Sequence, residues 1–141
     1  MPIYKTGLIA GNFDLIHPGY IHMFNECKDY CEHLIICLHE DPSIERPEKH
    51  KPILTIEERM LILSSLRTID EIIVYRREQE LLEILINRAP EVRFLGDDYL
   101  NKRFTGDHLN IPIIFISRDH GWSTTKLIHR IKNLETNKHL I

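Results

Sequence analysis

Three absences limit the kinds of protein that this sequence of 141 residues can encode. No apolar run approaches the roughly 20 residues that a membrane-spanning helix needs, so we expect no membrane association. Positive charge is not in excess, because 18 Lys and Arg residues stand against 21 Asp and Glu residues. A partner of nucleic acid is therefore not expected. The first residues enter an apolar run too short for a signal peptide, which predicts a cytoplasmic protein.

Cysteine is also scarce, and Cys27, Cys31 and Cys37 are the whole set. An odd number in a chain without a secretion signal argues against a disulfide framework. Cys27 and Cys31 are four residues apart on a predicted helix and can face the same way. No second pair at zinc-like spacing follows them, so we predict no metal site built by the protein. We interpret the three thiols as small buried hydrophobic groups.

What the sequence does contain is a regular alternation of apolar runs and helical patterns, over a length that suits one domain, residues 1–141. The runs predict strands at 8–10, 34–38, 71–75, 92–95 and 113–116. Helices are predicted at 19–30, from 55 to about 66, at 78–88 and at 123–134. Near-continuous apolar strands that alternate with helices indicate an α/β fold with a five-stranded parallel sheet and helices on both faces.

The helix after residue 55 has the clearest start signal in the chain. Thr55 is the expected cap and Glu58 stands at the third helical position, which is the pattern of a capping box. The spacing of apolar residues predicts that one side of this helix is buried, and the residues concerned are Met60, Leu61, Leu63 and Leu66.

The first candidate site is the segment 11–20, which follows the first strand. Gly11 lets the backbone approach a ligand closely, and Gly19 stands where free helix N–H groups attract phosphate. His17 lies on the same turn and can donate a hydrogen bond to a phosphoryl oxygen as charge builds in a transition state. A strand-to-helix turn whose histidine caps the helix explains the same residues equally well.

The second candidate site is the segment 118–126, which follows the last strand. Ser123 or Thr124 can cap the final helix, and the same groups can hold a triphosphate, to which Arg118 adds a charged fork. Plain capping is the alternative. Parallel strands end at one edge of a sheet, where ligands of α/β folds bind, so the two segments together favour a phosphate site.

Two further groups of polar residues are weaker candidates. The loop 40–52 carries Arg46, Lys49 and Lys51, which can neutralise phosphate or simply be solvated. The segment 96–99 places paired carboxylates after the fourth strand, where they can bind ribose, an acceptor or Mg²⁺ through water. Since the chain has no Walker A pattern and no evident nucleophile, these parts suit in-line nucleotidyl transfer without a covalent intermediate.

The motifs carry a family resemblance over nearly the whole chain. Segment 11–20 is similar to the Gly-x-Phe-Asp-x-x-His-x-Gly-His motif of the cytidylyltransferase-like nucleotidyltransferases, and segment 118–125 resembles their Arg-Thr-x-Gly-Ile-Ser-Thr-Thr motif. Within this family, the chain resembles the glycerol-3-phosphate cytidylyltransferases. The resemblance implies a Rossmann-like three-layer sandwich, a homodimer, and Mg²⁺ held mainly by the nucleotide phosphates. It implies attack of an acceptor phosphate on the α-phosphorus of CTP.

The resemblance also implies roles for individual residues. The nucleotide would contact Asn12, Phe13, His17, Tyr20, Lys51, Arg67, Arg118, Trp122, Ser123, Thr124 and Thr125. Catalysis would fall to His17, Tyr20, Lys51 and Arg118. We add Lys49, Asp97 and Arg77 as contacts of the acceptor.

The chain departs from the family pattern most plainly at Tyr20, where the first motif has its second histidine. A phenol cannot become a cation, and replacing a charge-assisted hydrogen bond by a neutral one costs about 1 kcal/mol or more. Our leading prediction is transfer of CMP from CTP to a small polyol phosphate. One alternative is an adenylyltransferase that uses ATP and a sugar phosphate, since segments 41–46 and 51–53 resemble heptose-phosphate adenylyltransferases. The other is a nucleotide-binding protein that has lost catalysis.

Overall fold

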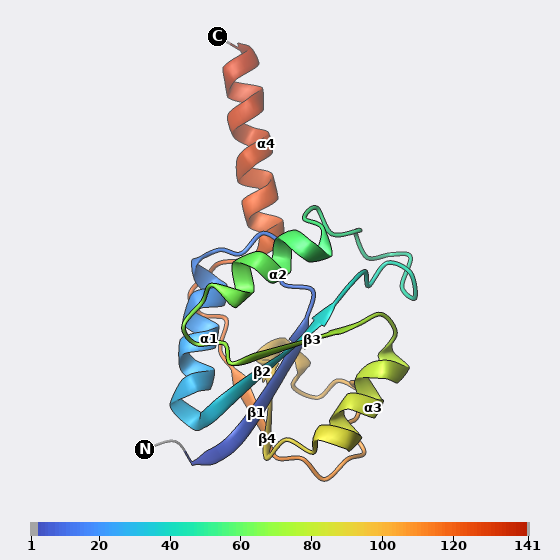
Figure 1. The fold of residues 1–141 in the computed structure, drawn as a ribbon. Helices are drawn as coiled ribbons and strands as arrows, with labels where there is room; N and C mark the ends of the chain where they lie inside the picture. The colour runs from blue at the N-terminus through green and yellow to red at the C-terminus, as the bar shows by residue number, and fades with distance from the viewer. Residues whose placement is uncertain (1–2, 141) are drawn as a thin grey trace.

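The computed structural model describes residues 3–140 of the chain. One sheet contains five parallel strands in the order β3-β2-β1-β4-β5 (Figure 1). The strands are β1 (Tyr4–Gly11), β2 (Cys31–His39), β3 (Glu71–Tyr75), β4 (Val92–Gly96) and β5 (Ile113–Ile116). The helices are α1 (Pro18–Tyr30), α2 (Ile56–Ser64), α3 (Glu78–Arg88) and α4 (Thr124–Leu140), with the short 3-10 helix η1 (Asp97–Tyr99) after β4.

The two faces of the sheet bury separate apolar cores, because successive strand residues point to opposite sides. Ile9 and Ile36 belong to the core that packs with residues of α1 and α2. Leu8 and Ile35 belong to the core that packs with residues of α3 and with Leu109. The predicted α/β sandwich, with a five-stranded parallel sheet between helical layers, is confirmed.

The prediction for α2 is confirmed at its start but holds only in part along its apolar side, where Leu63 is buried and Leu66 packs on the core. The hydroxyl of Thr55 accepts from the N–H of Glu58 at 3.1 Å, and the Glu58 carboxylate accepts from the N–H of Thr55 at 2.8 Å. However, Leu61 is 70% exposed, and Leu63 is the apolar residue of the helix that is buried. The second buried residue is Arg59, a charged side chain that the apolar pattern did not indicate.

The side chain of Arg59 connects α2 to the neighbouring chain segments through hydrogen bonds. Its Nη1 donates to the carbonyls of Asn12 and His39, and its Nη2 donates to the carbonyl of Glu40. Its Nε donates to the carbonyls of Leu54 and Thr55. The guanidinium therefore satisfies backbone acceptors after β1, after β2 and before α2 at once.

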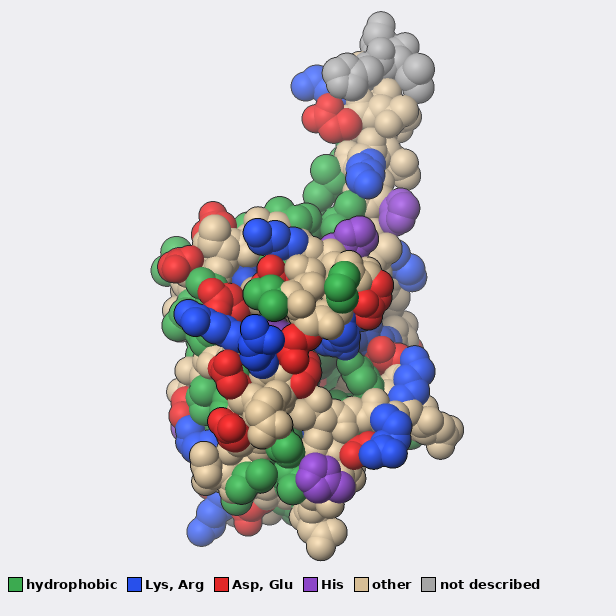
Figure 2. Space-filling view, turned by 90° about the vertical axis from the view of Figure 1, so that its right-hand side faces the viewer, with side chains coloured by type: hydrophobic (Ala, Val, Ile, Leu, Met, Phe, Trp, Pro, Cys, Tyr) green, Lys and Arg blue, Asp and Glu red, His purple; other side chains and the backbone are tan. Residues whose placement is uncertain are grey.

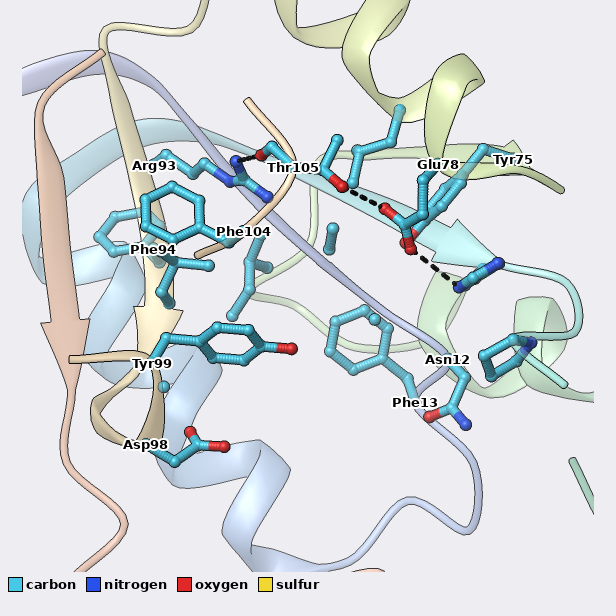
Figure 3. Close-up of a pocket in the computed structure, with 18 of the residues that line it drawn as sticks. Asn12, Phe13, Tyr75, Glu78, Arg93, Phe94, Asp98, Tyr99, Phe104 and Thr105 are labelled. Carbon is cyan, nitrogen blue, oxygen red and sulfur yellow. Dashed lines mark hydrogen bonds and ion pairs between the residues drawn. The ribbon is translucent and has the colours of Figure 1, made fainter. Parts of the chain in front are cut away.

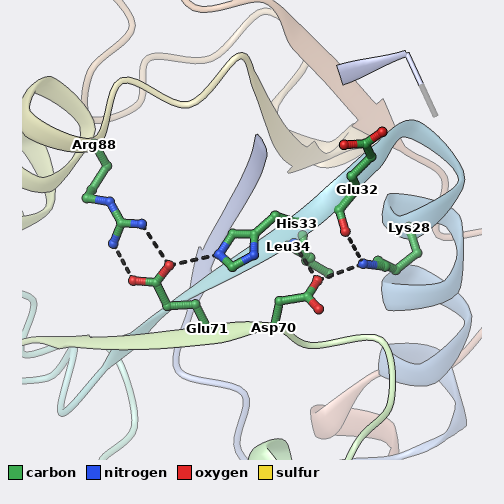
Figure 4. Close-up of polar contacts among 7 residues, drawn as sticks. All are labelled: Lys28, Glu32, His33, Leu34, Asp70, Glu71 and Arg88. Atoms are coloured by element: carbon green, nitrogen blue, oxygen red, sulfur yellow. Dashed lines mark hydrogen bonds and ion pairs between the residues drawn. The ribbon is translucent and has the colours of Figure 1, made fainter. Parts of the chain in front are cut away.

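A network of charged groups joins both helical layers to the edge of the sheet (Figure 4). The carboxylate of Asp70 accepts from Lys28 of α1 at 2.6 Å and from the N–H of Leu34 in β2 at 2.8 Å. Glu71 of β3 accepts from Nη2 of Arg88 in α3 at 2.7 Å. It also lies 2.9 Å from Nε2 of His33.

Helix α4 rises clear of the rest of the molecule (Figures 1 and 2). It begins close to the predicted residue and continues past 134, where the helical pattern was expected to end. Ile131 and Leu134 on this helix are 50% and 65% exposed. None of the helices in residues 3–140 is long and apolar enough to cross a bilayer.

The order of the strands positions the candidate site. From the central strand β1 the chain moves outward through β2 and β3, then returns to build β4 and β5 on the other side of β1. The connections therefore diverge between the carboxyl ends of β1 and β4, which is where α/β folds bind ligands. Gly11 ends β1 and Gly96 ends β4 at this point.

Candidate active site

The turn between β1 and α1 has an unusual backbone that long-range hydrogen bonds hold in place. Phe13 and Leu15 both have positive φ angles, of 47° and 50°, which non-glycine residues rarely adopt. The buried carboxylate of Asp14 accepts from the N–H groups of Ile53 and Leu54 at 2.7 and 3.0 Å. Asp14 therefore orders this turn and ties it to the segment before α2.

His17 is the N-cap residue of α1, as the simpler interpretation of the motif predicted, but capping occupies only one of its nitrogens. Its Nδ1 accepts from the N–H of Gly19 at 3.1 Å. An imidazole that accepts at Nδ1 carries its proton at Nε2 when it is neutral. The buried Nε2 has no hydrogen-bond partner among the described residues. His17 thus presents a free N–H donor.

The surroundings of His17 favour this neutral form. Burial lowers the pKa of the imidazole, and the nearby charges of His120 and Arg118 lower it further. Its ring is stacked with Trp122 at 5.7 Å and lies 4.4 Å from the ring of Tyr20. The packing holds the ring in one orientation, which is what a preorganised donor requires.

Gly19 permits the close approach of the two motifs. A Cβ atom at this position would lie 2.6 Å from Cβ of Trp122 and 2.8 Å from Cε1 of His120. Any side chain would therefore push the 118–125 segment away from the start of α1. The requirement for glycine here is steric, because the contacting residues, His120 and Trp122, are more than 100 positions away in the sequence but adjacent in space.

Hydroxyl groups also connect the 11–20 segment to the 118–125 segment. Thr124 donates to the carbonyl of Asp14 at 3.3 Å, and its oxygen lies 3.3 Å from the phenol oxygen of Tyr20. The hydroxyl of Ser123 accepts from the N–H of Lys126 at 3.1 Å, so Ser123 caps α4. The starts of α1 and α4 thus lie side by side, each with backbone N–H groups that attract anions.

Arg118 is held at the carboxyl ends of β4 and β5 by the two aspartates after β4. Its Nε lies 3.3 Å from the carboxylate of Asp98. Its backbone N–H donates to the carboxylate of Asp97 at 3.3 Å. Asp97 therefore positions the Arg118 backbone, and Asp98 is the carboxylate that reaches the site.

Two adjoining cavities open at this edge of the sheet. We call the first, of about 530 Å³, the motif cavity, because His17, His120, Trp122 and residues 123–125 line it. The second, of about 610 Å³, is the deep cavity, which extends along the sheet toward Tyr75, Arg93 and Phe104. Their shared border consists of Asn12, Tyr20, Met23, Pro42, Lys49, Gly96 and Arg118. A ligand in one cavity can therefore meet a ligand in the other at Arg118 and Lys49.

Several polar residues of the deep cavity were not predicted from the sequence, Arg93, Glu78 and Thr105 among them (Figure 3). Arg93 lies in β4, and Glu78 lies in the first turn of α3. Thr105 lies in the segment between β4 and β5. The Thr105 hydroxyl donates to Glu78 at 2.8 Å. Arg93 interrupts the apolar run of β4, and a charge inside a buried strand was the signal that could have identified it.

The structure brings together most of the predicted site residues but leaves four outside both cavities. Phe13 lines the deep cavity and Lys49 lines both. Lys51, Arg67, Arg77 and Asp97 line neither cavity in the described part of the chain. Lys51, Arg67 and Arg77 are exposed, and their roles stay predictions. His50 and Lys132 line the motif cavity instead, and neither was predicted.

The carboxylates of the site do not form a metal centre. Among the side chains that the structure describes, no group of three from His, Cys, Asp or Glu is arranged to hold a metal ion. Asp14 is occupied by backbone donors and Asp98 by Arg118. The three cysteines are buried thiols, as predicted.

Comparison with known proteins supports the motif assignment. Residues 8–139 match the family model described as cytidylyltransferase-like. The chain is 32% identical over 136 residues to the bifunctional protein HldE of Helicobacter hepaticus, and 30% identical over 132 residues to that of Paramagnetospirillum magneticum. These matches cover 96% and 90% of this chain but only 28% and 27% of the relatives.

A solved structure shows the same fold. The lipopolysaccharide core biosynthesis protein from Thermoplasma volcanium superposes with a TM-score of 0.64, at 23% identity, over 81% of this chain and 95% of that protein. The two motifs, their junction at the switch point of the sheet and the family match agree. The chain belongs to the cytidylyltransferase-like family of nucleotidyltransferases.

Proposed function

We propose that the chain transfers a nucleotidyl group from a nucleoside triphosphate to the phosphate of a small acceptor. The observation that carries this proposal is the free Nε2–H of His17, which is buried and held beside two adjacent helix starts. A fixed, neutral donor at this place suits the charge that builds on a phosphoryl group in transit.

In the proposed step, an oxygen of the acceptor phosphate attacks the α-phosphorus of the triphosphate. A new P–O bond forms, the bond between the α-phosphorus and the bridging oxygen breaks, and pyrophosphate leaves with the electron pair. No covalent enzyme intermediate is needed. The nucleotide occupies the motif cavity and the acceptor the deep cavity, so that the two phosphates meet at Arg118 and Lys49 on the shared border.

The charge on the triphosphate is matched by groups of the motif cavity. Arg118, Lys49 and Lys132 supply positive charge, and residues 123–125 supply N–H donors at the start of α4, together with the hydroxyls of Ser123 and Thr125. Because the described carboxylates form no metal cluster, we propose that Mg²⁺ arrives bound to the nucleotide phosphates. There it would neutralise charge on the triphosphate.

The identity of the nucleotide is the finer part of the proposal. The relatives compared above carry the name bifunctional protein HldE, and none of them that of a cytidylyltransferase. The loop segments 41–46 and 51–53 also resemble heptose-phosphate adenylyltransferases. We therefore place ATP with a sugar phosphate first, ahead of CTP with a polyol phosphate.

A panel of nucleotides and phosphorylated acceptors tests the proposal, with pyrophosphate release as the readout. We expect turnover with ATP and little with CTP, and the reverse result would restore the cytidylyltransferase assignment. His17→Ala is the negative control, and His129→Ala, at an exposed position on α4, is the matched positive control. Calorimetric binding of a triphosphate with no pyrophosphate released from any acceptor would favour a nucleotide-binding protein, the alternative that Tyr20 motivates.

The wider setting of the activity is also a proposal. The chain spans about 28% of the length of the relatives it matches, so a second activity of such proteins is not assigned to it. We propose a homodimer, on the family resemblance alone, and a cytoplasmic location, on the sequence expectation given above. Light scattering of the purified chain measures the oligomeric state directly.

A further inference from the structure

The deep cavity contains a buried cation that the mechanism proposed above does not use. Arg93 lies in β4, is 4% exposed and lines this cavity but not the motif cavity. A buried guanidinium is costly unless an anion or several acceptors satisfy its donors, as the five carbonyls around Arg59 do. The contacts of Arg93 therefore show whether the protein itself supplies that anion.

The protein supplies only part of what Arg93 needs. Its Nη1 donates to the carbonyl of Thr105, and its guanidinium lies 5.3 Å from the ring centroid of Phe104. Its buried Nε has no partner among the described residues, and no described carboxylate lies within ion-pair distance of it. Burial lowers the pKa of Arg93, which is the direction expected for a cation without a counter-ion.

The nearest acidic side chain of the cavity is already engaged elsewhere. Glu78 accepts from the Thr105 hydroxyl at 2.8 Å through Oε2. Its Oε1 lies 3.5 Å from Nη2 of Arg46 and 3.9 Å from Nδ1 of His39. Arg46 also lines the deep cavity, and its Nε is likewise buried without a partner among the described residues. Two guanidinium groups thus line one cavity, and each has a buried Nε–H without a partner among the described residues.

The position of Arg93 separates this cation from the reacting phosphates. Gly96 belongs to the shared border, and Arg93 precedes it by three residues along β4. At about 3.3 Å per residue, the two backbone positions are about 10 Å apart. Figure 3 shows Arg93 and Glu78 at one side of the cavity and Asp98 at the other, with Tyr99 between Arg93 and Asp98. An anion bound at Arg93 is therefore not the phosphate that attacks at the border.

We infer that the acceptor carries two anionic groups, the attacking phosphate and a second phosphate or carboxylate that Arg93 and Arg46 bind at the far end of the deep cavity. The inference rests on the proposed function for the role of the first phosphate. The aromatic side chains of Tyr75, Tyr99 and Phe104 also line the deep cavity, which suits a sugar-like body whose C–H groups pack on rings.

Binding to the full chain tests this inference without any turnover. Calorimetry with matched pairs of probes compares glucose 1-phosphate with glucose 1,6-bisphosphate and with glucuronic acid 1-phosphate. A second set compares glycerol 3-phosphate with 3-phosphoglycerate. We expect the doubly anionic member of at least one pair to bind about 10- to 100-fold more tightly, as expected for a charge-assisted contact. The bisphosphate and the uronate distinguish a second phosphate from a carboxylate.

Two substitutions assign the preference to the far end of the cavity. Arg93→Gln should reduce it to less than about 3-fold while leaving nucleotide binding unchanged. Arg93 is buried, so its substitution can impair folding. Arg46→Gln, at a half-buried loop residue, is therefore a second variant that should also reduce the preference. Lys102→Gln removes an exposed positive charge that lines neither cavity, and it should keep the full preference.

The outcomes separate this inference from the proposed function. His17→Ala, without turnover, should retain the preference for doubly anionic probes. If the wild type prefers the doubly anionic probes but shows no turnover, the proposed function is contradicted and the inference about the second anionic group stands. Wild-type protein that shows no preference in any pair, or a preference that survives both Arg93→Gln and Arg46→Gln, overturns the inference whether or not the enzyme turns over.

Discussion

The phenol oxygen of Tyr20 and the hydroxyl oxygen of Thr124 lie 3.3 Å apart and join the first turn of α1 to the first residue of α4. Thr124 donates its own proton to the carbonyl of Asp14, so the phenol is the donor to Thr124. The proton of Tyr20 is thus used within the protein, and the phenol oxygen keeps only acceptor capacity. At the position where related motifs have a histidine, this chain has a residue that links the two motifs.

We expect Tyr20→Phe to lower the stability by about 1 kcal/mol, the usual contribution of one hydrogen bond. Turnover in the proposed reaction should fall by less than about 10-fold, because the phenol donates to Thr124 rather than to substrate. Thermal unfolding and pyrophosphate release measure the two effects. Loss of turnover by about 1,000-fold with normal stability would instead show that Tyr20 contacts the reacting groups.

His17→Ala should reduce kcat by about 100- to 1,000-fold, the effect of removing one preorganised donor. The binding of the nucleotide should change far less, because Arg118 and the start of α4 remain. Steady-state kinetics and calorimetry on the same preparation check this, with circular dichroism to confirm the fold. Nearly unchanged turnover would show that the turn after β1 is not the site of the chemistry.

The pH profile follows from the same histidine. Its pKa is lowered by burial and by the charges of His120 and Arg118, and protonation would remove the acceptor that Gly19 uses. The neutral, active form should therefore persist as the pH falls below 6.5, the usual value for histidine. Because the unfolded chain takes up this proton first, the stability should begin to fall as the pH passes downward through 6.5. A kcat profile that loses half its value at or above that pH would contradict this prediction.

Glu71 should contribute stability that acid removes. Its hydrogen bonds with Arg88, the largest cause, and with His33 lower its pKa from 4.5 to about 2. The contribution is fully present above pH 4.5 and is lost as the pH falls from 4.5 toward 2. Glu71→Gln should cost about 1 kcal/mol at neutral pH, after allowance for solvent screening at this partly exposed site. Urea unfolding at several pH values measures this, with Glu83→Gln as control, and a constant difference down to pH 2 would refute it.

Arg59→Met should be among the most damaging substitutions outside the apolar cores. It removes donors from five carbonyls around the carboxyl ends of β1 and β2. Leaving such buried acceptors unpaired should cost about 3 kcal/mol or more. Chemical unfolding checks the cost, with exposed Lys102→Met as the comparison. A loss below about 1 kcal/mol would mean that the loop carbonyls find other donors.

The sequence alone determined the fold class, the alternation of strands and helices, the cap of α2 and the two motifs at the switch point. Each of these depends on local chemistry: an apolar period, a capping pattern, or glycine and hydroxyl residues at short spacing. The same reasoning explains the capping role of His17, which is two residues from its partner Gly19.

Only the tertiary structure decided which predicted residues reach the site. The spacing of apolar residues predicts that Leu61 and Leu63 belong to a helix. Whether each of them is buried depends on how the helix packs against its neighbours, and Leu61 is exposed. The loop places Lys49 and not Lys51 in the cavities because hydrogen bonds from Ile53 and Leu54 to Asp14, 39 and 40 residues away, set its path. Arg93 lies in a strand that was predicted from its apolar residues, and only the tertiary structure shows that this charge is buried beside a cavity without an ion-pair partner in the described chain. Contacts between distant segments decide these points, and no local pattern in the sequence encodes them.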